Sequence, residues 1–151
     1  MIYRNTKIGL VLKPPPGWQA DEQVGPAIFT LAFFAPQEDP REPYRENVVL
    51  IVQPLFAPAT VDEYMAFYLL PMRRPPLQFE MPSRAKFADL PARKVSYTGP
   101  LNPMMPLPSK CFLLWAVSDT KGYSLCYAAR AEKFDQHFQA IQELIDSVVI
   151  V

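Results

Sequence analysis

The chain has 151 residues, enough for one domain with a substantial buried core and barely enough for two. Half of its residues are apolar and 13% are aromatic, which excludes an intrinsically disordered chain. Fifteen basic residues balance fifteen acidic ones, and this neutrality argues against binding to nucleic-acid phosphates, which needs a surplus of Lys and Arg. We therefore expect residues 1–151 to form a single domain that binds no nucleic acid.

Proline is over-represented, with 18 residues against five glycines. Because proline fixes φ and donates no backbone hydrogen bond, the connections between elements should be stiff and extended. The sequence contains no apolar run of the ~18–20 residues that cross a bilayer. The first twelve residues hold only a four-residue apolar patch, too short for a signal peptide. We predict a cytoplasmic protein, with the mature form of an exported protein as the open alternative.

Short apolar runs alternate with prolines in the first third of the chain. Residues 7–13 predict a strand, which the prolines at 14–16 end. Gly17-Trp18 predicts a turn, and residues 27–35 predict a second strand that is apolar on both faces. The element order therefore starts with strands separated by proline-rich connections.

A charged loop and a helix start follow. Residues 36–46 carry the densest charge in the chain, and residues 47–53 form a β-branched run typical of a central strand. The segment Thr60-Val61-Asp62-Glu63 has the spacing of a capping box, so a helix should begin there. It should end near Leu70, because the proline that follows disfavours a helical conformation at that residue.

Strand patterns dominate the second half. Residues 78–88 and 92–98 predict strands on either side of a turn at Asp89–Pro91. Residues 111–130 predict a β-hairpin whose loop is residues 119–122. The hairpin is the clearest element in the sequence.

Both faces of this hairpin are apolar. If Ser118 lies opposite Tyr123, then Trp115 opposes Cys126, and Cys111 and Cys126 lie diagonally on one face. A disulfide needs Cα atoms within about 7 Å, so we favour two free buried thiols over a disulfide. Since antiparallel sheets often leave one face to solvent, a hairpin apolar on both sides must be covered twice.

Two amphipathic segments can provide this cover. The helix after Thr60 would cover one face, and a C-terminal helix over residues 132–147 the other, with a short last strand at residues 148–151. The apolar residues of the C-terminal helix recur at helical spacing: Phe134, Phe138, Ile141 and Ile145. The predicted fold class is α+β, with an antiparallel sheet of about six strands and helices packed on both faces.

Four stretches of the chain are similar to a known family. They are Pro16-Gly17-Trp18; residues 45–52 leading into 60–64; residues 89–97; and residues 122–127 with the terminal segment 134–149. They resemble the PsbP-like/DcrB-like family, which includes the extrinsic PsbP subunit of the oxygen-evolving complex and the yeast nuclear-import factor that binds the Ran GTPase. The resemblance spans most of the chain and implies an α/β/α sandwich. It also implies a non-enzymatic role, since members are docking subunits, GTPase partners, envelope lipoproteins and chaperones for type VI secretion effectors.

The residues themselves offer little catalytic chemistry. His137 is the single histidine, which excludes a site that needs two imidazoles. Cys111 and Cys126 sit in predicted strand interiors, where activation as nucleophiles is unfavourable. Five glycines leave no phosphate-binding loop. The carboxylates of residues 38–46 match no calcium loop and are interleaved with arginines. We expect no enzyme, no metal and no cofactor.

The stretch Pro100–Pro108 is the main candidate for partner binding. It predicts a long apolar connection with little capacity to form a helix or a central strand. Such a loop can offer Leu101, Met104, Met105 and Leu107 to a partner at low entropic cost. The alternative is that it folds back and caps one end of the sheet.

Three functions compete. The favoured one is an adaptor or chaperone-like module that holds a hydrophobic partner segment on apolar loops or a sheet face. The second is an assembly subunit, either a homodimer or a component of an envelope or photosynthetic complex. The third is a small-ligand binder or enzyme beside residues 36–46, which requires Arg41, Tyr44 and Arg45 to converge on a pocket.

The second function would bury a set of exposed apolar side chains between chains. That set is Tyr3, Trp18, Phe56, Met104 and Met105.

Overall fold

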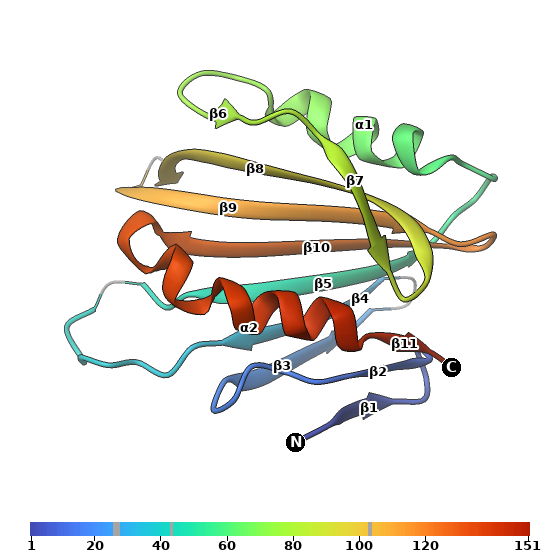
Figure 1. Cartoon of the computed structure of the whole chain (residues 1–151), viewed down its shortest axis with the longest axis horizontal. Helices are drawn as coiled ribbons and strands as arrows, with labels where there is room; N and C mark the ends of the chain where they lie inside the picture. Colours follow the sequence, from blue (N-terminus) through green and yellow to red (C-terminus); the bar gives the residue numbers. More distant parts are fainter. Residues whose placement is uncertain (26–27, 43, 103) are drawn as a thin grey trace.

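Figure 1 shows the computed structural model of the chain, which describes residues 1–25, 28–42, 44–102 and 104–151. Over these residues the chain forms an antiparallel sheet of eight strands, a second sheet of three strands, two α-helices and one short 3₁₀ helix. The fold is mixed α+β as predicted, and its main sheet is larger than the six or so strands expected. Ala27, Pro43 and Pro103, which belonged to the predicted strand 27–35, loop 36–46 and stretch 100–108, lie outside the described residues.

The strands of the main sheet are β3 (Gln19–Val24), β4 (Phe29–Phe34), β5 (Asn47–Pro54), β6 (Gln78–Phe79), β7 (Ser83–Phe87), β8 (Leu90–Asn102), β9 (Met105–Val117) and β10 (Lys121–Arg130). Their order is β3-β4-β5-β10-β9-β8-β6, and β7 also pairs with β8. The small sheet consists of β1 (Tyr3–Asn5), β2 (Leu10–Leu12) and β11 (Val149–Ile150). It joins the two ends of the chain, as Figure 1 shows.

Helix α1 (Val61–Met72) begins at the predicted capping box. The Glu63 amide donates to the Thr60 hydroxyl at 3.1 Å, and the Thr60 amide donates to the Glu63 carboxylate at 3.0 Å. The helix runs past the predicted end at Leu70, because Pro71 is accommodated in the last turn. Helix α2 (Phe134–Ser147) follows the 3₁₀ helix η1 (Ala131–Lys133) and matches the predicted C-terminal helix.

Two turns differ from prediction. The predicted turn at Asp89–Pro91 is a two-residue hairpin loop of Ala88 and Asp89, both with positive φ, because Phe87 pairs directly with Leu90. In the β9–β10 hairpin Gly122 lies opposite Val117, so the register is shifted by two residues from the predicted one. A shift of two leaves every side chain on its predicted face, since side chains alternate with period two.

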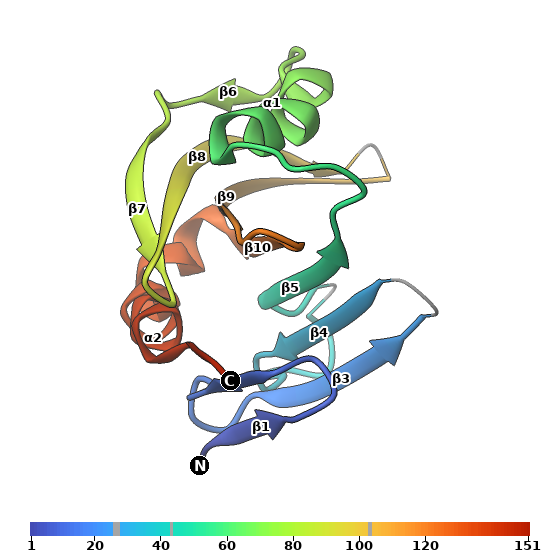
Figure 2. The ribbon, with the colours of Figure 1, turned by 90° about the vertical axis from the view of Figure 1, so that its right-hand side faces the viewer.

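Each side of the main sheet carries one helix in the described part of the chain (Figure 2). Tyr64 and Leu69 of α1 pack with Trp115 on one side. On the other side, Ile141 of α2 packs in a larger core that includes Tyr127 and also takes in the small sheet. Burial of large side chains stabilises by roughly 1.5–3 kcal/mol each, so these two clusters hold the layers together.

The seat of α1 on the sheet depends on Gly122 in β10. The tip of the Tyr64 ring occupies the space above this glycine, and its hydroxyl accepts a 2.7 Å hydrogen bond from Gln53 and lies 3.1 Å from the Ser124 hydroxyl. Because glycine has no side chain, Gly122 leaves room for the Tyr64 ring, and this contact fixes the position of the helix on the sheet.

We expect Gly122→Ala to lower the free energy of unfolding by about 1–3 kcal/mol, because the new methyl group would lie 2.4 Å from Cζ of Tyr64. Urea titration measures this. In a Tyr64→Leu background the same change should cost much less, since the ring tip is gone. An equal cost in both backgrounds would contradict the packing explanation.

Candidate functional site

Helix α1 covers only part of its side of the main sheet. It packs on β8 and β9, whereas β10, β5 and β4 extend beyond it, as Figure 2 shows. Along β5 the burial alternates strictly: residues on the α2 side are buried and residues on the α1 side are only half-buried. We call the uncovered part the open sheet face. Its half-buried apolar members are Phe34, Val49, Ile51, Cys126 and Ala128.

Strand register arranges these residues in rows across the sheet. Val49 pairs with Ala32 on one side and with Cys126 on the other, which gives a continuous apolar row over β4, β5 and β10. Ile51 pairs with Thr30 and Ser124 in the next row. The rows end at the polar edge strand β3, so the open sheet face is an apolar strip with a hydrophilic margin.

A group of hydroxyls borders the strip on the α1 side. The Gln53 amide donates to the hydroxyls of both Tyr64 and Tyr68, and the Tyr64 hydroxyl also contacts Ser124. The rings of Tyr64 and Tyr68 meet edge to face. This border is rigid, because each of these side chains is held by hydrogen bonds or by ring packing.

The stretch 100–108 lies near the end of the strip at which β10 ends. Its predicted conformation was wrong. It is not an irregular connection: β8 and β9 run through it as paired strands, with Pro100 opposite Pro108. The register shifts between the Pro100–Pro108 pair and the Asn102–Met105 pair, and Leu101 and Leu107 are half-buried at this irregularity. Met104, at the turn, is 93% exposed.

Prolines fit these strands because the neighbouring strands end first. The pairing of β10 with β9 stops at Ser109, and the pairing of β6 with β8 stops at Thr98. Beyond these residues β8 and β9 pair with each other as a two-stranded tip. A proline is tolerated where its nitrogen faces away from a partner strand.

The three residues predicted to converge in the loop 36–46 diverge instead. Arg41 is exposed and pairs with Asp39 at 3.2 Å. The Tyr44 hydroxyl donates to the carbonyl of Ala128 at 3.4 Å, at the edge of the open sheet face. Arg45 lies at β4, where its guanidinium donates to the Ala35 carbonyl at 2.7 Å and lies over the Phe34 ring, 5.6 Å from the ring centroid. The loop therefore places Tyr44 and Arg45 at different strands of the strip, and among its described residues the three side chains share no pocket.

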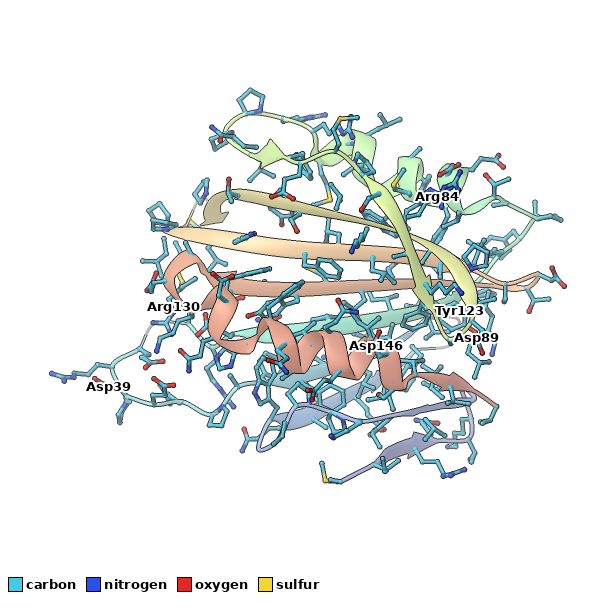
Figure 3. All side chains as sticks on the ribbon, viewed as in Figure 1. Asp39, Arg84, Asp89, Tyr123, Arg130 and Asp146 are labelled. Carbon is cyan, nitrogen blue, oxygen red and sulfur yellow. The ribbon has the colours of Figure 1, made fainter. Side chains whose placement is uncertain are left out.

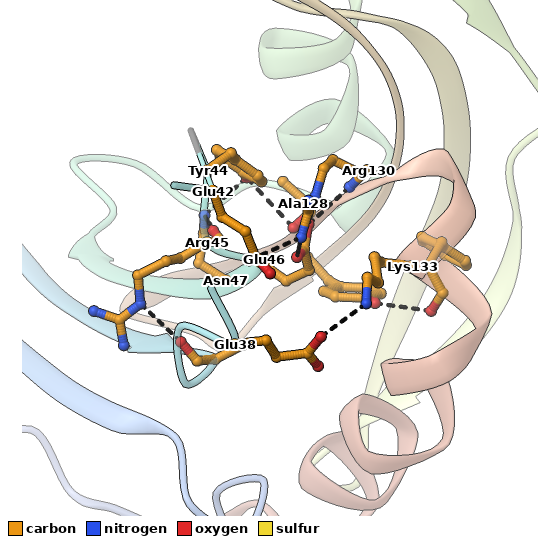
Figure 4. A network of polar contacts seen from close by, with 12 residues as sticks. Glu38, Glu42, Tyr44, Arg45, Glu46, Asn47, Ala128, Arg130 and Lys133 are labelled. Atoms are coloured by element: carbon orange, nitrogen blue, oxygen red, sulfur yellow. Dashed lines mark hydrogen bonds and ion pairs between the residues drawn. The ribbon is translucent and has the colours of Figure 1, made fainter. Parts of the chain in front are cut away.

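A buried ion pair fixes this loop to the end of β10 (Figure 4). Glu46 is 3% exposed and accepts from the Arg130 guanidinium at 2.7 Å and from its backbone amide at 2.9 Å. Arg130 also contacts Glu42 at 3.3 Å, and these carboxylates raise the pKa of its guanidinium. Lys133 pairs with Glu38 at 3.0 Å. The sequence shows only that the acids of residues 38–46 alternate with arginines, whereas the glutamates among them pair with Arg130 and Lys133, far along the chain.

The two thiols lie together at the Tyr44 end of the strip. Both cysteines are free, Cys111 buried and Cys126 half-buried, in the predicted diagonal placement. A hydrogen bond from the Cys126 thiol, helped by one from Tyr97, lowers the pKa of Cys111 to about 7 against the opposing effect of burial. Donation to Cys111 and burial raise the pKa of Cys126. One thiolate is therefore favoured and the second proton is retained.

Other residues singled out in the sequence have internal roles. The His137 ring packs edge-on against Trp18 with centroids 5.2 Å apart, and burial lowers the His137 pKa. Tyr3 packs edge-on against Phe33 and donates to Glu22. Across the described ranges no three His, Cys, Asp or Glu side chains gather as a metal site. In the same ranges neither helix has both the length and the apolarity to cross a membrane.

We expect Glu46→Gln to lower the free energy of unfolding by about 2–4 kcal/mol, because it removes one charge of a buried pair. Urea unfolding followed by tryptophan fluorescence measures the change. Asp39→Asn is the matched control, since the Asp39–Arg41 pair is solvent-exposed, and it should leave the midpoint unchanged. Equal effects of the two substitutions would contradict a structural role for the Glu46–Arg130 pair.

The thiols make a pH-dependent prediction. The pKa of Cys111 is about 7 in the folded chain and near 9.0 otherwise, so its contribution to the unfolding free energy should grow as pH rises between these values. Ultraviolet thiolate absorbance should show one thiol ionising near pH 7. Cys126→Ala should move that transition toward pH 9, because the donor is lost. An unshifted transition in this variant would show that Cys126 does not acidify Cys111.

No protein-family model matches the chain's sequence, and no curated protein matches it. Solved structures do resemble it. LpqN of Mycobacterium tuberculosis, involved in cell envelope biogenesis, superposes with a TM-score of 0.74 at 14% identity over 94% of this chain and 83% of LpqN. CyanoP, the PsbP of Synechocystis sp. PCC 6803, gives 0.59 at 14% identity over 100% and 92%.

The Ran-binding protein Mog1p of Saccharomyces cerevisiae gives a TM-score of 0.60 at 12% identity, over 100% of this chain and 95% of Mog1p. At such identities the likeness establishes the fold and nothing further. The resemblance inferred from the sequence is thus confirmed at the level of fold: the chain has the PsbP-like fold, in which an antiparallel sheet packs against helices.

Proposed function

We propose that the chain is a non-enzymatic protein-binding module that holds an apolar segment of a partner protein on the open sheet face, in an adaptor or chaperone-like role. The observation that carries the proposal is the half-buried apolar strip over β4, β5 and β10, which α1 leaves uncovered. Val49, Ile51 and Cys126 lie at its centre. An apolar segment that covered them would gain roughly 25 cal/mol for each Å² removed from water.

The surroundings of the strip suit such a partner. Its floor is a rigid sheet, so little ordering entropy is lost on binding. The Tyr44 hydroxyl at one end can accept a hydrogen bond from a partner amide, and the Tyr68 hydroxyl at the α1 border can donate one to a partner carbonyl. The proline-stiffened tip adds Leu101, Leu107 and the exposed Met104 beside the strip.

The proteins of the same fold support a binding role in general terms. Mog1p is a Ran-binding protein, and LpqN is involved in cell envelope biogenesis. The family that the sequence resembles also includes chaperones of type VI secretion effectors, and this membership points in the same direction. A chaperone of this kind would act in the cytoplasm, where it would shield the partner's apolar segment before export.

The competing functions have weaker support. A ligand site beside residues 36–46 needs Arg41, Tyr44 and Arg45 to converge, and these side chains point apart. An assembly role was expected to bury Tyr3 and Trp18 between chains, and both already pack inside this chain. The assembly hypothesis keeps only Phe56 and the methionine tip as its contact residues.

A fluorescent apolar peptide of about fifteen Leu, Ala and Val residues with Ser-Gly ends, titrated with the protein, tests the proposal. We expect Ile51→Asp to weaken binding at least tenfold, because a charge placed in an apolar contact is costly to bury. The milder Ile51→Ser should weaken it less and guards against unfolding of the Asp variant. Met104→Asp tests the contribution of the tip.

Ile2→Asp is the matched control, since Ile2 is a more exposed apolar residue next to the small sheet. Its binding should equal that of the unmodified chain. Equal weakening by Ile2→Asp and Ile51→Asp would overturn the proposed site. If the chain sediments as a dimer and Ile51→Asp converts it to a monomer, the strip is a self-association surface and the proposed occupant is wrong.

A further inference from the structure

Helix α1 carries a second apolar stripe on the side that faces away from the sheet. Its inner side packs through Tyr64 and Leu69. On its outer side Phe67 is 74% exposed and Leu70 is 66% exposed, and they are neighbours at helical spacing. A helix that is apolar on all sides is usually buried on all sides. We therefore expect the outer stripe to contact another surface.

Exposed cations surround this stripe. Arg73 and Arg74 follow the C-terminal end of α1, and Arg84 and Lys86 project from β7. The pairing of Arg84 with Arg93, whose guanidinium binds Asp62 of α1 at 2.8 Å, places this part of β7 beside the helix.

The acids nearby are largely engaged. Asp62 is paired with Arg93, and the Glu63 carboxylate is held in the capping box. Glu80 remains among the cations. Over residues 61–94 the chain has six Lys and Arg residues and four Asp and Glu residues, so this segment carries a small positive excess in a neutral chain.

A shallow pocket lies at the C-terminal end of α1. It has a volume of about 280 Å³ and is lined by Arg73, Arg74, Glu80 and the apolar residues Leu77, Phe79 and Met81, among others. Met81 is 86% exposed at its rim. Two arginines together with apolar residues in one lining suit a ligand that carries a phosphate on an apolar body, because the guanidinium groups can bind the phosphate.

We propose that the outer face of α1, together with residues 73–86, docks on an anionic lipid bilayer. Phe67, Leu70 and Met81 enter the headgroup region, while the guanidinium and ammonium groups bind lipid phosphates. A bilayer is favoured over an acidic peptide because Phe67 and Leu70 are both largely exposed on the outer side of a helix. A fluid surface accommodates projecting side chains, whereas a bound peptide needs a groove or a strand edge.

This inference does not depend on the proposed function. The lipid-facing stripe consists of side chains on the outer side of α1, whereas the open sheet face consists of side chains of β4, β5 and β10. Substitutions can therefore abolish one surface without changing the other.

Co-sedimentation with lipid vesicles tests the docking surface. We expect the full chain to bind vesicles that contain about one quarter phosphatidylglycerol, not vesicles of phosphatidylcholine alone, and to dissociate near 1 M salt, where the Debye length is about 3 Å. The double variant Arg73→Gln/Arg74→Gln should lower the partition coefficient about tenfold or more. Phe67→Ser/Leu70→Ser should lower it too, while the salt dependence of the remaining binding persists.

Arg41→Gln is the matched control, because it removes an exposed arginine from the loop 36–46 at another part of the surface (Figure 3), and it should bind as the unmodified chain does. Far-UV circular dichroism checks that the variants remain folded. The proposal is overturned if the chain does not bind the anionic vesicles, or if Arg41→Gln and Arg73→Gln/Arg74→Gln weaken binding equally. Binding to poly-glutamate without binding to vesicles would assign the surface to an acidic protein and also overturn it.

Discussion

The structure depends on one constraint: the β9–β10 hairpin is apolar on both faces, and each face must be kept from water. Helix α2, with the small sheet, covers one side in a large core that contains Tyr123 and Tyr127. Helix α1 covers the other side mainly over β8 and β9, and its Tyr64 reaches Gly122 and Ser124 of β10. The layer on the α1 side of the sheet is therefore incomplete. The strip over β4, β5 and β10 is the part of the sheet that this layer does not cover. Its position follows from the seat of α1, which Tyr64 fixes above Gly122.

The sequence predicted the faces of the sheet better than its edges. A register error of two residues in the β9–β10 hairpin did no harm, because side chains alternate with period two and Trp115 stayed on its predicted side. Strand β3 had no signal, since an edge strand of polar residues lacks the alternation that marks a strand. The prolines of the stretch 100–108 predict an irregular connection only if partner strands lie on both sides of it. They lie in a two-stranded tip, where each strand has one free side.

The candidate site was predictable in part for the same physical reason. The apolar character of Leu101 and Leu107 predicts a contact role, and both residues are half-buried in the β8–β9 tip. The strip itself was not recognised, because Val49 and Ile51 look like buried core in a β-branched run. Nor could the pairing of Glu46 with Arg130 be predicted, since the partners are 84 residues apart and meet only through the order of β5 and β10. Local charge patterns gave no information about it.

Helix α1 explains why one short element can connect two different surfaces. With little amphipathic contrast, it packs inward through Tyr64 and Leu69 and still presents Phe67 and Leu70 outward. An ordinary amphipathic helix would have a polar outer face that is exposed to solvent and needs no further contact. Here the apolar outer stripe is retained next to Arg73 and Arg74, which follow the helix. Helix α1 therefore contributes one side to the core and exposes a second apolar side, while the sheet toward β3 stays uncovered.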